Sequence, residues 1–408
     1  MERRVRIKFL LNIYYIIDKS MKLNQVEIKA VATVGLIMAI RMLGIFLILP
    51  VFSVYAEKYP GADLALAGIA FGIYALVQSV LQIPFGWLSD RIGRKPVLII
   101  GLSLFAIGSV IGGMAENINE LIIARIIQGA GAVSSVAIAS LGDVTRTGVR
   151  AQSFTIVGIT IGVTFLLAII IGPLLAAEVG FSSLFYILAA LSVLSILVTV
   201  FFFPKIEKKE FLAEEATILT YLKRPEIRKL FLSVAIISLT VNMFVFIYPL
   251  SWKSLGVNEA DLWQVYLIAL IPTALFAYPY VRYSEKRGKL KVATMTAWAF
   301  IAVSFLVYPA SSMFIWVLYL AGMAYFMGHT ILQSVFPAYL TQRVGQEKRG
   351  ITTGVYNLSS FLGAAIGGMS AGYLYQLNPH IPLITALFLV IAWGLIGLPN
   401  PPEKKSSK

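Results

Sequence analysis

The sequence predicts an all-α membrane protein with twelve transmembrane helices in two pseudo-symmetric six-helix bundles. Of its 408 residues, 58% are hydrophobic and 13% are charged, whereas soluble domains have about 45–50% apolar and about 25% charged residues. The apolar residues gather in stretches of about 20, the length of helix that crosses a bilayer core of about 30 Å. Basic residues lie almost entirely on one side of these stretches, which supports the count of twelve.

The apolar stretches form two groups of six. The first six cover residues 28–56, 64–89, 96–115, 118–141, 153–177 and 181–203. The second six cover residues 230–252, 262–284, 291–309, 313–340, 351–376 and 381–398. A long polar segment between the groups is predicted to be a cytoplasmic linker with a short amphipathic helix. The predicted parts are a cytoplasmic N-terminal segment, two bundles joined by the linker, and a cytoplasmic tail, at residues 1–27, 28–203, 204–229, 230–399 and 400–408.

The N-terminal segment leaves two interpretations open. It has a basic start and a short apolar run, but no small-residue cleavage site follows, which argues against a secretory signal. It is either an interfacial helix with one basic and one apolar side, or an extension that precedes a true start at Met21.

The distribution of basic residues predicts the orientation. Of the 34 Lys and Arg residues, Lys58 and Lys253 lie in loops on one side, Arg41 and Arg125 lie inside apolar stretches, and the rest lie on the opposite side. The positive-inside rule places that side, with both termini, in the cytoplasm. The net charge of +14 is then explained by a basic face beside anionic lipid in the cell membrane, and no nucleic-acid partner is predicted.

A weak internal repeat relates the two halves. Pro50 and Pro249 lie late in the first and seventh stretches, and Arg150 and Arg349 precede the fifth and eleventh stretches at the same offset. In membrane proteins such duplicated halves enclose a site near the midplane that can face either side.

The sharpest motif is GWLSDRIGRK at residues 86–95, between the second and third stretches. Gly86 would let another backbone approach closely, and Gly93 would permit a tight turn. Asp90 could accept hydrogen bonds from the N-terminus of a neighbouring helix, or pair with Arg94. The alternative is a charged loop that serves only as a topology signal, but glycines and a carboxylate at fixed spacing favour a specific role.

This stretch resembles the signature loop of the major facilitator superfamily, G-x-x-x-D-R-x-G-R-K. Further motifs are similar to those of the twelve-helix drug:proton antiporter branch of that family. Leu43 and Gly44, followed by Pro50, resemble its first-span motif.

The fourth and fifth spans carry two more matches to the same branch. The fourth-span motif is matched by Leu121, Arg125, Gln128, Gly129, Gly131 and Ala132. Gly172 and Pro173 resemble the core of the fifth-span antiporter motif. The antiporter pattern has Gly at three positions where this chain has Ala168, Ala176 and Ala177.

The resemblance implies a conformational switch at the loop between the second and third spans. Its residues would be Gly86, Asp90, Arg91, Gly93, Arg94, Lys95 and Asp143. In an outward-facing state, Asp90 would meet the N-terminal end of the eleventh span near Thr352. Asp143 would join Arg91 or Arg94 in a small charge network, or alternatively make a plain helix-end interaction with Arg146.

Ionisable groups inside membrane spans are candidates for function, because each costs at least about 2.5–3.5 kcal/mol on insertion scales. Arg41 lies near the middle of the first span, and Arg125 lies in the fourth span one turn from Gln128. Either arginine could instead hold helices together by binding backbone carbonyls or Gln side chains. All 20 Asp and Glu residues lie in loops, tails or span ends, so the arginines predict a positively charged site.

The second half supplies other polar candidates for substrate or coupling. His329 in the tenth span is a deep group that titrates near neutral pH, and it is either a packed, hydrogen-bonded residue or a proton carrier. Asn242 in the seventh span and Gln333 in the tenth are candidates for the lining of a cavity.

Glycine pairs at G-x-x-x-G spacing are predicted to mark close helix contacts. They are Gly158 with Gly162 in the fifth span, and Gly363 with Gly367 and Gly368 with Gly372 in the eleventh. Gly172 and Pro173 are also predicted to serve helix packing.

Secondary active transport of a small organic solute by alternating access is the leading functional prediction, and the resemblance implies efflux with proton antiport. The alternatives are uptake or exchange of an organic anion, because the candidate site has two arginines and no acid, and, outside transport, a membrane receptor or scaffold. The expected partners are the solute, a proton or other coupling ion, and membrane lipid, and the chain is expected to be a monomer.

Enzymatic chemistry is not predicted. The sequence has no G-x-x-x-x-G-K-[ST] loop for ATP and no H-E-x-x-H metal motif, and it contains no cysteine. An intramembrane enzyme would need a nucleophile and base or a metal set, and His329 has no obvious partner for such chemistry. No catalytic residue, metal site or cofactor is therefore predicted.

Overall fold

The computed structural model describes residues 23–131, 133–204, 224–343 and 349–399, and throughout these ranges the chain forms helices and no strand. Ten helical segments of the described residues are long and apolar enough to cross a membrane. α15, with 29 residues, and the shorter apolar α16, with 16 residues, complete the predicted twelve. The predicted fold class is thereby confirmed.

Some predicted segments lie wholly or largely outside the described residues. These are residues 1–22 of the N-terminal segment, 205–223 of the linker, and the tail 400–408. The interfacial helix expected near the N-terminus and the amphipathic helix expected in the linker fall within them and stay predictions.

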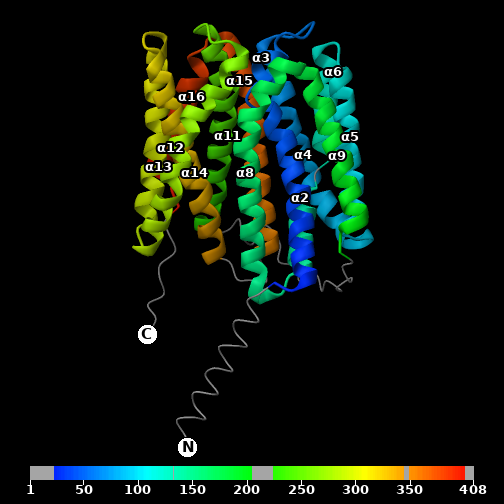
Figure 1. Cartoon of the computed structure of the whole chain (residues 1–408). Helices are drawn as coiled ribbons and strands as arrows, with labels where there is room; N and C mark the ends of the chain where they lie inside the picture. The colour runs from blue at the N-terminus through cyan, green and yellow to red at the C-terminus, as the bar shows by residue number, and fades with distance from the viewer. Residues whose placement is uncertain (1–22, 132, 205–223, 344–348, 400–408) are drawn as a thin grey trace, which may run out of the picture.

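Each bundle consists of six spans. In the first bundle, two of these spans are each made of two helices. The first bundle contains α2 (Gln25–Ile48) with α3 (Phe52–Ala56), α4 (Leu64–Ile92), α5 (Arg94–Met114), α6 (Ile118–Ala130) with α7 (Ser134–Val144), α8 (Thr147–Val179) and α9 (Phe181–Phe202). The second contains α11 (Pro225–Ser254), η1 (Glu259–Asp261), α12 (Leu262–Lys286), α13 (Leu290–Val307), η2 (Tyr308–Ser312), α14 (Ile315–Arg343), α15 (Arg349–Leu377) and α16 (Ile381–Ile396). Figure 1 shows the helices side by side along one common direction, with α2, α4, α5, α8 and α9 in one group and α11, α12, α13, α14 and α16 in the other.

The fourth span is broken where one continuous stretch was expected. α6 ends at Ala130 and α7 begins at Ser134, so a non-helical step lies near the middle of the membrane. Gly131 adopts φ −73° and ψ 45°, and its carbonyl oxygen accepts a hydrogen bond from Arg41 Nη2 at 3.3 Å. Irregular backbone is tolerated at membrane depth where protein buries it. The break therefore depends on a charged side chain from the first span.

The two bundles meet along α4 and α15, which run antiparallel. We call the end with the α3–α4 and α11–α12 connections the outer end, and the end with the α4–α5 turn the inner end, after the predicted orientation. A Cβ atom added to Gly68 would lie 2.8 Å from Gly372 Cα, and one added to Gly72 would lie 2.6 Å from the Ala365 oxygen. The four glycines at this contact, Gly68, Gly72, Gly368 and Gly372, are called the glycine seam.

The contact between α4 and α15 opens toward the inner end. Continuing the antiparallel register of the glycine seam places Gly86 opposite Gly354, yet a Cβ atom added to either glycine would meet nothing within 4 Å. At the outer half the bundles also touch through the rings of Phe71 and Phe246, whose centroids are 5.6 Å apart. The bundles are thus joined at the outer half and separate at the inner half along this pair of helices.

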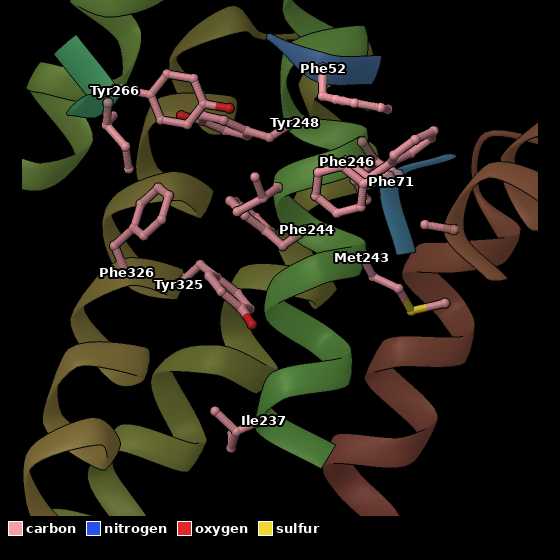
Figure 2. Packing of buried hydrophobic residues seen from close by; sticks show 14 of the residues in the cluster. Phe52, Phe71, Ile237, Met243, Phe244, Phe246, Tyr248, Tyr266, Tyr325 and Phe326 are labelled. Atoms are coloured by element: carbon pink, nitrogen blue, oxygen red, sulfur yellow. The ribbon is translucent and has the colours of Figure 1, made fainter. Parts of the chain in front are cut away.

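Aromatic side chains fill the outer half of the second bundle. Phe244 on α11 stacks on Tyr325 of α14 with ring centroids 4.1 Å apart, and on Tyr248 at 4.9 Å. Tyr266 and Phe326 close the cluster (Figure 2). Stacked and edge-on rings add specific geometry to the burial of large apolar surfaces, so this half forms a solid core rather than a cavity.

Candidate functional site

The motif between α4 and α5 forms a tight turn that positions an arginine. Gly93 lies between the two helices at φ +100°, a conformation that favours glycine. The turn directs Arg94 back toward α4, where its Nη1 lies 2.5 Å from Asp90 Oδ1 and 2.5 Å from Ser89 Oγ. Arg94 Nε also bonds Asp143 Oδ2 at 2.9 Å. One guanidinium thus connects α4, α5 and α7 at the inner end.

The other basic residues of the motif serve neighbouring elements. The Arg91 guanidinium lies 3.8 Å from the centre of the Trp87 ring. Lys95 Nζ donates to the Val200 carbonyl at 2.7 Å, near the C-terminal end of α9, where the helix dipole favours a cation. Gly86 makes no close backbone contact in this structure, because α15 has diverged from α4 at that level.

A buried carboxylate that was not among the predicted candidates lies near the start of the first span. Glu27 is 1% exposed, and its Oε1 lies 2.8 Å from Nε of Arg146, the residue that caps the start of α8. Its hydrogen bond raises the pKa of Arg146. Asn24 and Glu27 also form a capping box at the start of α2. An Asn followed three residues later by Glu, just before an apolar run, was the signal that could have found it.

The two membrane arginines lie inside the first bundle, and both contact Tyr74. Arg41 is 2% exposed and donates from Nη1 to Ser134 Oγ and from Nη2 to the Tyr74 hydroxyl at 3.3 Å. The Arg125 guanidinium lies 4.5 Å from the centre of the Tyr74 ring. Arg125 Nη1 donates to Gln128 Oε1 at 2.8 Å. Arg41, Tyr74, Arg125 and Gln128 therefore form one buried network.

This network contains positive charge and neutral partners. Gln128 Nε2 donates to Ser109 Oγ at 2.8 Å, and Arg125 Nε donates to the Ala70 carbonyl at 3.4 Å. Among the ion pairs of the described residues, none includes Arg41 or Arg125. The arginines could serve substrate binding or helix packing, and both roles stay open. Their bonds hold helices together here, and their charges have no carboxylate partner among the described residues.

The polar candidates of the second bundle lie on two helices, α11 and α14. His329 and Gln333 are one turn apart on α14, with Nε2 atoms 3.4 Å apart, and the His329 ring stacks on Tyr325 at 6.3 Å. Gln333 is exposed on a helix whose opposite side is buried. Asn242 on α11 instead donates to the carbonyl of Ser238 in its own helix at 2.9 Å. The structure thus pairs His329 with Gln333, while Asn242 bonds the backbone of its own helix.

The glycine pairs show which packing predictions hold. Added Cβ atoms on Gly363 and Gly367 would overlap the carbonyl oxygens of Ala235 and Leu239 on α11, and the Gly368–Gly372 pair packs on α4. The prediction for the eleventh span is confirmed. The prediction for Gly158 and Gly162 is wrong, because nothing lies within 4 Å of either position.

The antiporter-like pair in the fifth span does pack closely. A Cβ atom added to Gly172 would overlap the carbonyl oxygen of Leu47 near the end of α2. Pro173 is buried within α8 beside it. The pair therefore holds α8 against α2 in the outer half of the first bundle. Within the described residues, no group of three or more His, Cys, Asp or Glu side chains could hold a metal ion.

Comparisons with known proteins agree with this geometry. The family model for the Major Facilitator Superfamily matches residues 34–229 and 230–408. The inner membrane transport protein YajR of Escherichia coli (strain K12) is 32% identical over 357 residues, covering 86% of this chain and 79% of that protein. The quinolone resistance protein NorA of Staphylococcus aureus (strain MRSA252) is 28% identical over 371 residues, covering 87% and 92%. The crystal structure of the human organic anion transporter MFSD10 (TETRAN) matches with a TM-score of 0.66 at 16% identity, covering 91% and 99%.

These matches confirm the predicted resemblance and the fold. The family and the relatives are transporters rather than enzymes, and the apolar helices make this chain a multi-pass membrane protein. The chain therefore belongs to the Major Facilitator Superfamily.

Proposed function

We propose that this transporter exports a small organic solute by alternating access in exchange for protons. The observation that carries the proposal is the contrast between its two ends. The glycine seam joins the bundles at the outer half, while at the inner end Asp90 is bound by Arg94 of its own bundle. This is the arrangement expected of a transporter open toward the inside.

The proposed switch moves Asp90 between two partners. When the inner end closes, Asp90 would leave Arg94 and meet the first turn of α15, near Thr352 and Thr353. The unpaired amides at a helix N-terminus favour a carboxylate. Arg94 would keep its bond to Asp143, 2.9 Å long here, so that the turn stays in place while its acid changes partner.

Efflux and proton coupling rest on different support. The relatives include a quinolone resistance protein, which supports export of an organic compound. The proposed coupling group is His329, since it is an ionisable side chain within a span. Gln333, 3.4 Å away and exposed, would connect it to water.

A second candidate function is uptake or exchange of an organic anion. It is favoured by the buried Arg41 and Arg125, which carry two positive charges without a carboxylate partner among the described residues. A buried charge without a partner is costly, and an anionic solute that reached the network would offset that cost.

The proposed setting is a monomer in the cell membrane with both termini and the inner end in the cytoplasm. The support is the basic residues, which are concentrated on that side of the spans. A membrane receptor or scaffold would need neither a switch nor a site accessible from both sides.

Transport into proteoliposomes tests these proposals directly. Purified protein is reconstituted, a pH gradient or none is imposed, and the uptake of cationic, neutral and anionic solutes is followed. Uptake of cationic or neutral solutes that is driven by protons leaving the vesicles would support proton-coupled export. Movement of anions alone, independent of pH gradient, would support the second candidate. Absence of movement of every tested solute, with and without the pH gradient, would count against both.

A further inference from the structure

Two lysines depart from the predicted charge distribution, and both connect the bundles. Lys58 and Lys253 are the basic residues that the sequence places in loops at the outer end. Lys58 Nζ lies 2.6 Å from Glu259 Oε2, and Lys253 Nζ lies 2.7 Å from Glu57 Oε1. Each pair has one member in the first bundle and one in the second.

The four side chains form one network. Lys253 Nζ also lies 3.6 Å from Glu259 Oε1, so the contacts run in the order Glu57, Lys253, Glu259, Lys58. We call these four residues the outer charge quartet. Each bundle contributes one acid and one base, so the quartet is neutral as a whole and complementary across the boundary.

The quartet differs in kind from the glycine seam beside it. The seam consists of backbone against backbone, and close packing of this type is short-ranged. The quartet consists of charged side chains, which are 21–47% exposed and lie at the outer end, with Lys253 in the last turn of α11 and Glu259 in η1. A neighbouring polar contact also crosses the boundary, from the Ala65 amide to Gln376 Oε1 at 3.0 Å. Opening the outer end would separate the charges of the quartet.

We propose that the outer charge quartet is a lock that holds the outer end closed and sets how often it opens. The proposal rests on alternating access, since a lock matters only if the outer end opens. The positive-inside rule gives Lys58 and Lys253 no role in topology, and their ion pairs across the boundary give them one in closure. A partly exposed ion pair shifts an equilibrium by roughly two- to fivefold. Such a lock favours closure without making it permanent.

Spin-label distances provide the test, and the absence of cysteine makes labelling simple. Labels at Asn119→Cys and Met313→Cys report on the outer end, and labels at Gln152→Cys and Lys286→Cys report on the inner end. These positions are exposed on different bundles. Pulsed electron–electron distance distributions are measured in lipid nanodiscs without any solute, so the readout does not depend on transport.

Neutralising and reversing charges give opposite expectations. Lys58→Gln and Lys253→Gln each remove one ion pair that crosses the boundary, and each should raise the outer-open fraction roughly two- to fivefold. Reversing all four charges together, with Glu57→Lys, Lys58→Glu, Lys253→Glu and Glu259→Lys, keeps every attractive contact and should restore the wild-type distribution. High salt should widen the outer distances of the wild type.

A matched control separates the lock from general charge effects. Glu178 is exposed near the outer end of α8 and forms no ion pair among the described residues, so Glu178→Gln should leave the distances unchanged. Unchanged distances in both lysine variants would overturn the proposal, as would a quadruple reversal that opens as far as Lys253→Gln. If the lysine variants shift the outer distances but the protein transports no solute, the lock is supported and the proposed function is rejected.

Discussion

Replacing Gly372 by Ala tests whether the glycine seam holds the two bundles together. The added Cβ atom would overlap the Leu64 carbonyl oxygen and lie 2.8 Å from Gly68 Cα. Both neighbours are backbone atoms, so neither can move aside as a flexible side chain would. Overpacking of this kind costs about 1–3 kcal/mol, which corresponds to roughly a five- to 150-fold change in an equilibrium constant. We expect Gly372→Ala to lower the melting temperature in detergent and to reduce transport.

The same substitution at another glycine provides the control. Gly162 lies in an α-helix of similar length, and an added Cβ atom there would meet nothing within 4 Å. Ala is favoured over Gly in a helix by roughly 0.5–1 kcal/mol, so Gly162→Ala should be neutral or slightly stabilising. Thermal stability is compared by the fraction of protein that remains monodisperse after heating. Equal melting temperatures for Gly372→Ala and Gly162→Ala would refute the reasoning from backbone contact.

Three further predictions concern the switch, the buried charge and the orientation. Asp90→Asn should reduce the transport rate at least about tenfold with normal expression, because a charge-assisted contact is worth about 1.5–3 kcal/mol; unchanged transport would leave the loop as a topology signal only. Arg41→Gln should raise the KM for anionic solutes roughly tenfold while membrane insertion stays intact. If cations are the best substrates and Arg41→Gln does not change transport, Arg41 has a structural role only. Cys introduced at Ser254 should react with an impermeant thiol reagent from outside cells, and Cys at Gly148 should not, with the opposite labelling contradicting the proposed orientation.

The spans and the switch turn could be predicted from sequence because their signals are local. A stretch of about 20 apolar residues has few alternatives to crossing a membrane. Gly93 between two such stretches marks a turn that needs positive φ, and the structure has φ +100° there. The family resemblance, rather than a local pattern, assigned Asp143 to the charge network, and its carboxylate bonds Arg94 in the structure.

The remaining features depend on contacts between distant segments. The G-x-x-x-G spacing occurs in α8 and α15 alike, yet only the α15 pairs have a helix against them. The spacing describes a smooth surface, and the arrangement of the other helices decides whether it is covered. The break after Ala130 is similarly hidden, because the Gly131 carbonyl depends on Arg41, 90 residues earlier. The outer charge quartet joins residues about 200 positions apart, beyond the reach of a local pattern.

The bond between Arg41 and the fourth span has a consequence for biogenesis. The first span enters the membrane with Arg41 before its partner Ser134 has been synthesised, 93 residues later. At about 5–20 residues per second, the wait lasts roughly 5–20 seconds. During that interval a guanidinium inside the bilayer costs about 2.5–3.5 kcal/mol without the bonds to Gly131 and Ser134 that later help to offset it. The nascent first span must therefore be held in the membrane by its own apolar residues until the fourth span has been inserted beside it.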